Sequence, residues 1–108
     1  MTEQNVIRDI RQAPFAWVAK NVIRLIREHF DSSSQLPLAQ STYLVLTEIA
    51  SNRQEDQFAA SYANIASMAG VSRRTIIRIM KQFEEIGIVS IKERVEGKRN
   101  LSNLITLL

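Results

Sequence analysis

Residues 62–91, YANIASMAGVSRRTIIRIMKQFEEIGIVSI, carry the clearest structural signal in this chain. Apolar side chains recur at helical spacing on both sides of Gly70, which predicts two helices joined by a tight turn at that glycine. The spacing changes after Gly87, where a run rich in isoleucine and valine favours a β-strand. The residues alone therefore predict the order helix, turn, helix, strand.

Residues that flank these two helices are typical of helix ends. Ser61 and Ser72 can each accept a hydrogen bond from the first turn of the helix that follows. Gly70 can adopt the left-handed backbone that ends a helix, and Gly87 stands where the second helix should stop. Because the second helix also opens with two arginines, the layout is that of a helix-turn-helix, in which one helix braces another that enters the DNA major groove.

The second helix divides into an apolar stripe and a basic face. The stripe, which we expect to be buried, comprises Val71, Ile76, Ile79, Met80, Phe83 and Ile86. The residues left facing outward are Arg73, Arg74, Ile77, Arg78, Lys81 and Gln82. An arginine at the start of such a helix can donate two hydrogen bonds to guanine O6 and N7, and Ile77 can contact a thymine methyl group. Arg74 and Arg78 lie one turn apart and share a face. Ser72 and Thr75 can each bond a phosphate at the helix N-terminus.

A β-hairpin is predicted after the second helix. Two β-prone runs flank Glu96-Gly97-Lys98, a sequence that favours a turn. The last run, LSNLITLL, is largely apolar and is expected to pack on the helices. A hairpin directly after a recognition-type helix is the wing of a winged helix. Lys98 and Arg99 near its tip can lie on the DNA backbone or in the minor groove, so they complete the predicted DNA-binding residues. That set is Ser72, Arg73, Arg74, Thr75, Ile77, Arg78, Lys81, Lys98 and Arg99.

The first half of the chain predicts two more helices. Pro14 in a first turn and an apolar stripe at helical spacing indicate a helix over residues 14–30. The stripe is Phe15, Val18, Ala19, Val22, Ile26 and Phe30. Residues 31–37, DSSSQLP, predict a turn or linker before another helix over residues 38–51. Residues 58–59 favour either a very short strand or an extended entry to the next helix.

The predicted fold class is mainly α (α+β): a winged helix-turn-helix with an extra N-terminal helix and a C-terminal β-hairpin wing. Residues 1–34 form the predicted N-terminal extension, and residues 38–108 form the predicted DNA-binding domain. Because that domain has apolar stripes of its own, helix 14–30 is surplus to the minimal fold. We therefore expect this helix to build a homodimer. The alternative is that it covers its own domain.

Basic residues concentrate in the predicted helix-turn-helix and wing. The chain has a net charge of +3. Residues 73–99 contain eight of the 14 basic residues but only four of the 11 acidic ones, a net +4, which leaves −1 for the rest of the chain. A charge excess confined to one structural unit indicates a surface for phosphates. The alternative is a solvated surface on which charges cluster by chance.

Composition gives little support to other kinds of chemistry. With no cysteine and one histidine, disulfides and thiolate metal sites are excluded and little remains for a zinc site. No apolar run approaches the roughly 18 residues of a membrane span, and the N-terminus has no signal-peptide core. We expect a cytoplasmic protein that does not bind membranes. The sequence has no nucleophile–base set and no phosphate-binding glycine loop, so we expect no enzymatic activity, cofactor or metal.

Residues 38–108 resemble the winged helix-turn-helix domains of plasmid and phage replication proteins and of related bacterial regulators. The segments that carry the resemblance are LAQSTYLVLTEIAS, ASYANIASMAGVSRRTIIRIMKQFEEIGIVSI and GKRNLSNLITL. Ile77 departs from the pattern, because such helices usually have a polar residue there. The resemblance implies sequence-specific binding of double-stranded DNA in replication or its control on a plasmid, phage or other mobile element. The alternatives are a transcription regulator and a winged helix that binds proteins rather than DNA.

Overall fold

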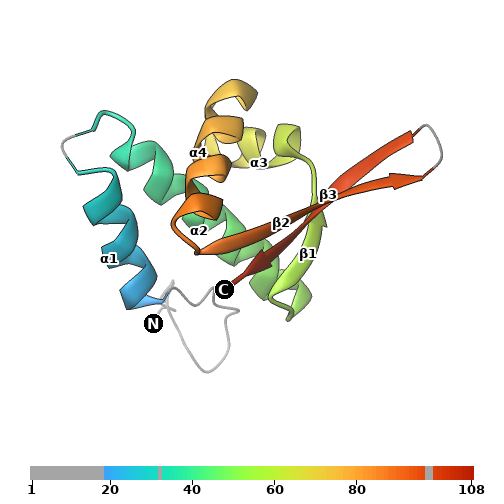
Figure 1. Ribbon diagram of the computed structural model, residues 1–108, viewed down its shortest axis with the longest axis horizontal. Helices are drawn as coiled ribbons and strands as arrows, with labels where there is room; N and C mark the ends of the chain where they lie inside the picture. The colour runs from blue at the N-terminus through green and yellow to red at the C-terminus, as the bar shows by residue number, and fades with distance from the viewer. Residues whose placement is uncertain (1–18, 32, 97–98) are drawn as a thin grey trace, which may run out of the picture.

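The computed structural model describes residues 19–31, 33–96 and 99–108. Within them, four helices and three strands follow one another along the chain (Figure 1). They are α1 (Lys20–His29), α2 (Leu36–Arg53), β1 (Gln57–Ala60), α3 (Tyr62–Ala69), α4 (Arg73–Glu85), β2 (Val89–Glu96) and β3 (Arg99–Leu107). This order confirms the predicted mainly α winged helix-turn-helix with an additional N-terminal helix and a C-terminal hairpin.

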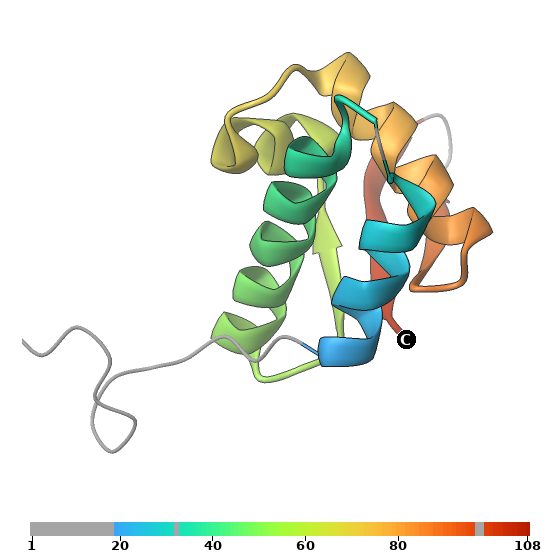
Figure 2. The ribbon, with the colours of Figure 1, turned by 90° about the vertical axis from the view of Figure 1, so that its left-hand side faces the viewer.

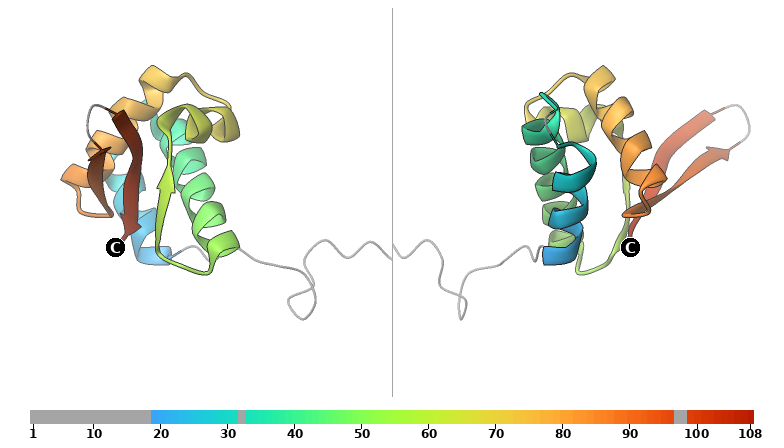
Figure 3. Two further views of the ribbon diagram at one scale, coloured as in Figure 1. Left: turned by 90° about the vertical axis from the view of Figure 1, so that its right-hand side faces the viewer. Right: turned by 60° about the vertical axis from the view of Figure 1, so that its left-hand side comes forward.

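The three strands form one antiparallel sheet in the order β1-β3-β2. β1 pairs only with the second half of β3, from Gln57↔Thr106 to Ala60↔Asn103. Beyond that point β2 and β3 continue as a two-stranded arm, which projects from the domain at the end opposite α1 (Figures 1 and 3). The predicted hairpin is confirmed, and its strands continue through the polar residues that the sequence placed outside the β-prone runs. The turn residues, 97–98, lie outside the described part of the chain.

The caps of α3 and α4 are those that the sequence predicts. The side chains of Ser61 and Ser72 each accept a hydrogen bond from the amide three residues later, both at 3.1 Å. Gly70 ends α3 with φ of 73°, and Gly87 follows α4 with φ of 79°. No atom outside their immediate chain neighbours lies within 4 Å of where a Cβ would stand on either glycine. Glycine is therefore favoured there by the left-handed backbone rather than by lack of space.

The hydrophobic core is organised around Phe83 of α4, which is completely buried. Its ring makes edge-to-face contacts with Phe30 beyond α1 and Tyr43 of α2, with ring centroids 6.1 and 6.5 Å apart. The other buried members of the predicted α4 stripe are Ile76, Ile79 and Met80, whereas Val71 and Ile86 are only partly buried. One face of α4 is thus fixed against two other helices.

The first helix packs on this same core. Val22, Ile26 and Phe30 of the predicted stripe are buried, and α1 lies alongside α2 (Figure 2). The helix begins at Lys20, because Ala19 has the extended backbone of an N-cap and is exposed rather than buried. Residues 14–18 of the predicted helix lie outside the described residues. The described part of the predicted N-terminal extension therefore covers its own domain.

Both ends of α2 and of β1 also differ from the predicted ones. α2 begins at Leu36, two residues early, and takes Pro37 into its first turn, where the missing N–H of proline is not needed. It ends at Arg53, and Gln54 stops it with a left-handed backbone, φ 56°. The short strand predicted over residues 58–59 exists as β1, one residue longer at each end.

We expect Phe83→Ala to lower the free energy of unfolding by about 3–5 kcal/mol, because it removes a buried ring that joins three helices. Urea unfolding followed by circular dichroism measures this loss. Ile77→Ala is the matched control on the same helix, since Ile77 is 45% exposed. Its cost should be well below that of Phe83→Ala. Equal costs for the two variants would contradict the role given to Phe83.

Candidate nucleic-acid interface

The solvent-facing side of α4 is basic. Arg73, Arg74, Arg78 and Lys81 are all exposed, and Ile77 lies among them with 45% of its surface accessible. The predicted face is thus confirmed for these five residues. Because the opposite side of the helix is buried in the core, α4 can present this face to a ligand without losing its anchorage.

The hydroxyls of Ser72 and Thr75 are hydrogen-bonded to each other at the N-terminus of α4. Ser72 Oγ accepts the backbone N–H of Thr75, and the two side-chain oxygens are 2.9 Å apart. The sequence assigned both hydroxyls to phosphate contact. In the free protein the Ser72 hydroxyl caps the helix, and the Thr75 hydroxyl is hydrogen-bonded to it. The first helical amides stay without intrahelical partners, and together with the helix dipole they favour an anion at this end. A phosphate here would stand beside the side chains of Arg73 and Arg74.

Hydrogen bonds hold the turn between α3 and α4. The amide of Val71 donates to the carbonyl oxygen of Ala66 at 3.1 Å and closes the turn. From α2, the Ser41 hydroxyl donates to the carbonyl oxygen of Ala69 at 3.3 Å. These bonds fix the end of α3 relative to the start of α4, where the basic face begins.

A side chain at the end of α1 contacts the C-terminal half of α4. His29 Nε2 lies 3.1 Å from Oε1 of Gln82. Gln82 was expected to face outward, but it is only partly exposed because this contact covers it. The pair is 53 residues apart, so helical spacing within α4 could not reveal it.

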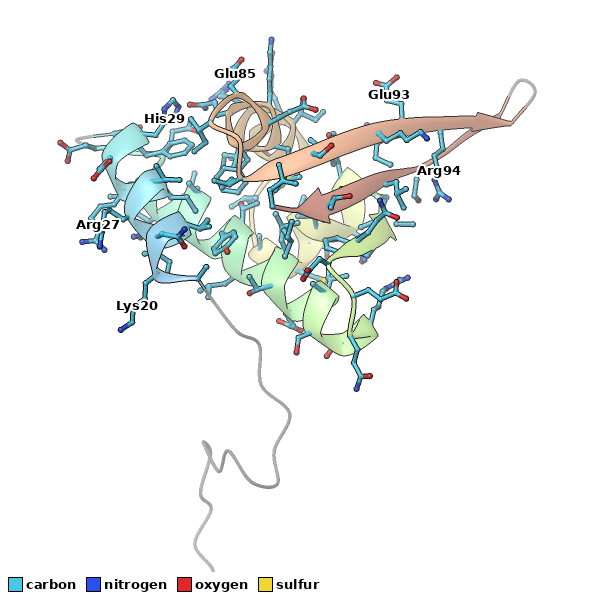
Figure 4. All side chains as sticks on the ribbon, turned by 60° about the horizontal axis from the view of Figure 1, so that its bottom comes forward. Lys20, Arg27, His29, Glu85, Glu93 and Arg94 are labelled. Carbon is cyan, nitrogen blue, oxygen red and sulfur yellow. The ribbon has the colours of Figure 1, made fainter. Side chains whose placement is uncertain are left out.

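The wing supplies a second basic element. Lys98 lies outside the described residues, and for Arg99 the structure gives only the backbone, which pairs with Glu96 as the first residue of β3. Nearer the domain, Glu93 and Arg94 project from opposite faces of the hairpin (Figure 4). The Nε of Arg94 donates to the carbonyl oxygen of Ser102 at 2.8 Å. Sequence reasoning missed this contact, because it depends on the strand register.

The described ranges offer neither a metal site nor a membrane-spanning helix. They contain no cluster of three or more side chains suited to holding a metal ion. They also contain no helix with the length and hydropathy needed to cross a membrane.

The comparisons with known proteins agree with this geometry. Residues 41–102 match the model of the Crp-like helix-turn-helix domain, and this segment is more than half of the chain. The protein therefore belongs to that family and binds DNA through its helix-turn-helix. The match runs from α2 to β3 and contains all of α4. A comparison with curated proteins gives no match.

Arg74→Ala should weaken binding to a preferred duplex by about 1–3 kcal/mol, because a bidentate base contact is lost. The duplex is obtained by enrichment from a random pool with the wild-type protein, and affinity is measured by fluorescence anisotropy. Arg27→Ala is the matched control, since Arg27 is an exposed arginine on α1 that points away from the hairpin (Figure 4). Loss of affinity in the control and none in Arg74→Ala would contradict the assigned face.

Proposed function

We propose that this protein recognises specific sites in double-stranded DNA and acts in replication, or in its control, on a plasmid, phage or other mobile element in the cytoplasm. The observation that carries DNA recognition is the exposed basic face of a capped and anchored α4. The genetic setting is supported by the resemblance of residues 38–108 to replication-protein domains.

In this proposal α4 lies in the major groove. The side chains of Arg73, Arg74 and Arg78 donate to base edges and phosphates, and Ile77 contacts a thymine methyl group. Lys81 and the wing residues Lys98 and Arg99 contact the backbone, which positions the protein without selecting sequence. Each phosphate contact releases counterions, so affinity should fall steeply with salt.

A transcription regulator would use the same interface, and the Crp-like family match supports it equally. The two functions differ in where the protein binds rather than in how it binds. A winged helix that binds only proteins would leave the arginines solvated. It would show no salt-dependent binding to duplex DNA.

Mapping the bound sites across the host genome and its mobile elements tests the function. We expect enrichment at a replication origin or at the region that controls an initiator. Enrichment confined to promoters elsewhere would establish transcription regulation instead. If no duplex sites are enriched, the protein-binding alternative replaces both.

We also propose that the protein forms a homodimer through the N-terminal helix region, residues 14–30. Leu25 of α1 is 42% exposed and Leu44 of α2 is 54% exposed, so large apolar side chains of both helices remain accessible to a partner. A cleft of about 270 Å³ opens between the two helices and is lined by Ile23, Ile26, Gln40, Tyr43 and Leu44. Since Val22, Ile26 and Phe30 are already buried in their own domain, a second copy would contact these remaining apolar residues. A dimer would place two recognition helices on a palindromic site.

Sedimentation at micromolar concentration tests the dimer. We expect the wild-type protein to sediment as a dimer and Leu25→Glu to sediment as a monomer, because a charge is costly in an apolar interface. Met68→Glu is the control, since Met68 is equally exposed but lies on α3. A wild-type protein that stays monomeric both free and on DNA would refute the dimer and leave α1 as an intramolecular brace.

A further inference from the structure

The wing leaves the sheet at an irregularity in β3. The last pair of β1 with β3 is Ala60↔Asn103, so no third strand from the described residues pairs with the hairpin beyond it. At the same place the register of β2 and β3 shifts between Lys92↔Leu104 and Arg94↔Leu101. One residue of β2 there faces two residues of β3, Ser102 and Asn103. Such a β-bulge bends a strand locally and increases its twist.

Both residues of the bulge are held by side chains. Arg94 of β2 donates from Nε to the carbonyl oxygen of Ser102 at 2.8 Å. Tyr62, the first residue of α3, forms a hydrogen bond with the side chain of Asn103. One bond therefore lies within the hairpin, and the other joins the hairpin to the helix that braces α4.

Charged residues from two other elements surround the Tyr62 hydroxyl. Burial raises the pKa of this hydroxyl above its ordinary 10.0, the bond to Asn103 opposes the shift, and the carboxylates of Glu84 and Glu93 raise it further. Glu84 belongs to α4 and Glu93 to β2, so the start of α3, the end of α4 and the root of the wing meet at this point. The Tyr62 hydroxyl therefore stays protonated at neutral pH.

We propose that Tyr62 and Arg94 are positioning residues for DNA binding, because they fix the angle at which the wing leaves the sheet and hence where its tip meets DNA relative to α4. About five residues separate the bulge from the tip, so the arm is roughly 16 Å long and a tilt of about 15° moves its tip by roughly 4 Å. A backbone contact made over about 3 Å cannot survive such a displacement. An isolated two-stranded hairpin has little stability of its own, so contacts at its base are needed to fix its orientation.

This positioning role rests on the proposed contact of the wing with DNA. If Tyr62 positions the wing, changing it should alter the contribution of Lys98 and Arg99 to DNA binding. Tyr62→Phe removes one hydroxyl and no charge. The slope of log affinity against log salt is measured on the enriched duplex for four proteins: wild type, Tyr62→Phe, the double variant Lys98→Ala with Arg99→Ala, and the combination of all three. We expect the double variant to flatten the slope by up to about 2 in the wild-type background. In the Tyr62→Phe background the same change should flatten it by less than half as much.

Two further variants make the outcome decisive. Tyr43→Phe alters a buried tyrosine far from the wing, whose hydroxyl bonds to the backbone of Ala19, so the full effect of the double variant should persist there. Arg94→Gln removes the hydrogen bond to Ser102 and should reduce the effect of the double variant on the salt slope, as Tyr62→Phe does. Thermal unfolding verifies that each variant is folded. If the double variant flattens the salt slope equally in all backgrounds, the positioning role is overturned and the wing contact with DNA stands. No effect in the wild-type background overturns both the wing contact and the positioning role.

Discussion

The contact of Phe83 with Phe30 and Tyr43 is the interaction on which the rest of the molecule depends. It joins α4 to α1 and α2 at the centre of the core. α4 carries four exposed basic residues, and a like-charge pair one turn apart, such as Arg74 and Arg78, costs a helix about 0.2–0.5 kcal/mol. Burial of one aromatic side chain contributes about 1.5–3 kcal/mol. The apolar side of α4 therefore outweighs the repulsion on its basic side, and the helix can hold a charged face ready for DNA.

The two elements proposed to contact DNA are fixed in different ways. α4 is held by apolar burial over its length and by the caps at its ends, so its position follows from the core. The wing has no core beyond β1, and its direction depends on the bulge at Ser102 and Asn103. This division suits a protein in which base contacts specify the site and backbone contacts position the protein. Errors in the wing would reduce affinity, whereas errors in α4 would change the sequence that is recognised.

Local signals made most of the fold predictable. The serine caps, the left-handed backbone at Gly70 and the turn at Gly87 depend on residues close in sequence, and each is found as predicted. Most of the predicted apolar stripe of α4 is buried as well. The five exposed residues of α4 followed from the same spacing. The start of α1 was not predicted, because apolar spacing continues upstream of Lys20 while the backbone of Ala19 is extended.

The missed contacts join different helices and strands. His29 with Gln82, Tyr62 with Asn103 and Arg94 with Ser102 depend on how helices pack and on where the strand register shifts. Spacing within one element gives no information on any of them. The packing of α1 could not be predicted for the same reason, since only the folded chain shows Val22, Ile26 and Phe30 buried against its core.

The central claim is that DNA binds on the exposed side of α4 and on the wing. Titration of the isotope-labelled protein with the enriched duplex, followed by amide NMR shifts, tests it most directly. The account predicts that the largest shifts fall in residues 72–81 and in the hairpin, while amides lining the cleft between α1 and α2 change little. Large shifts confined to that cleft, with residues 72–81 unaffected, would contradict it.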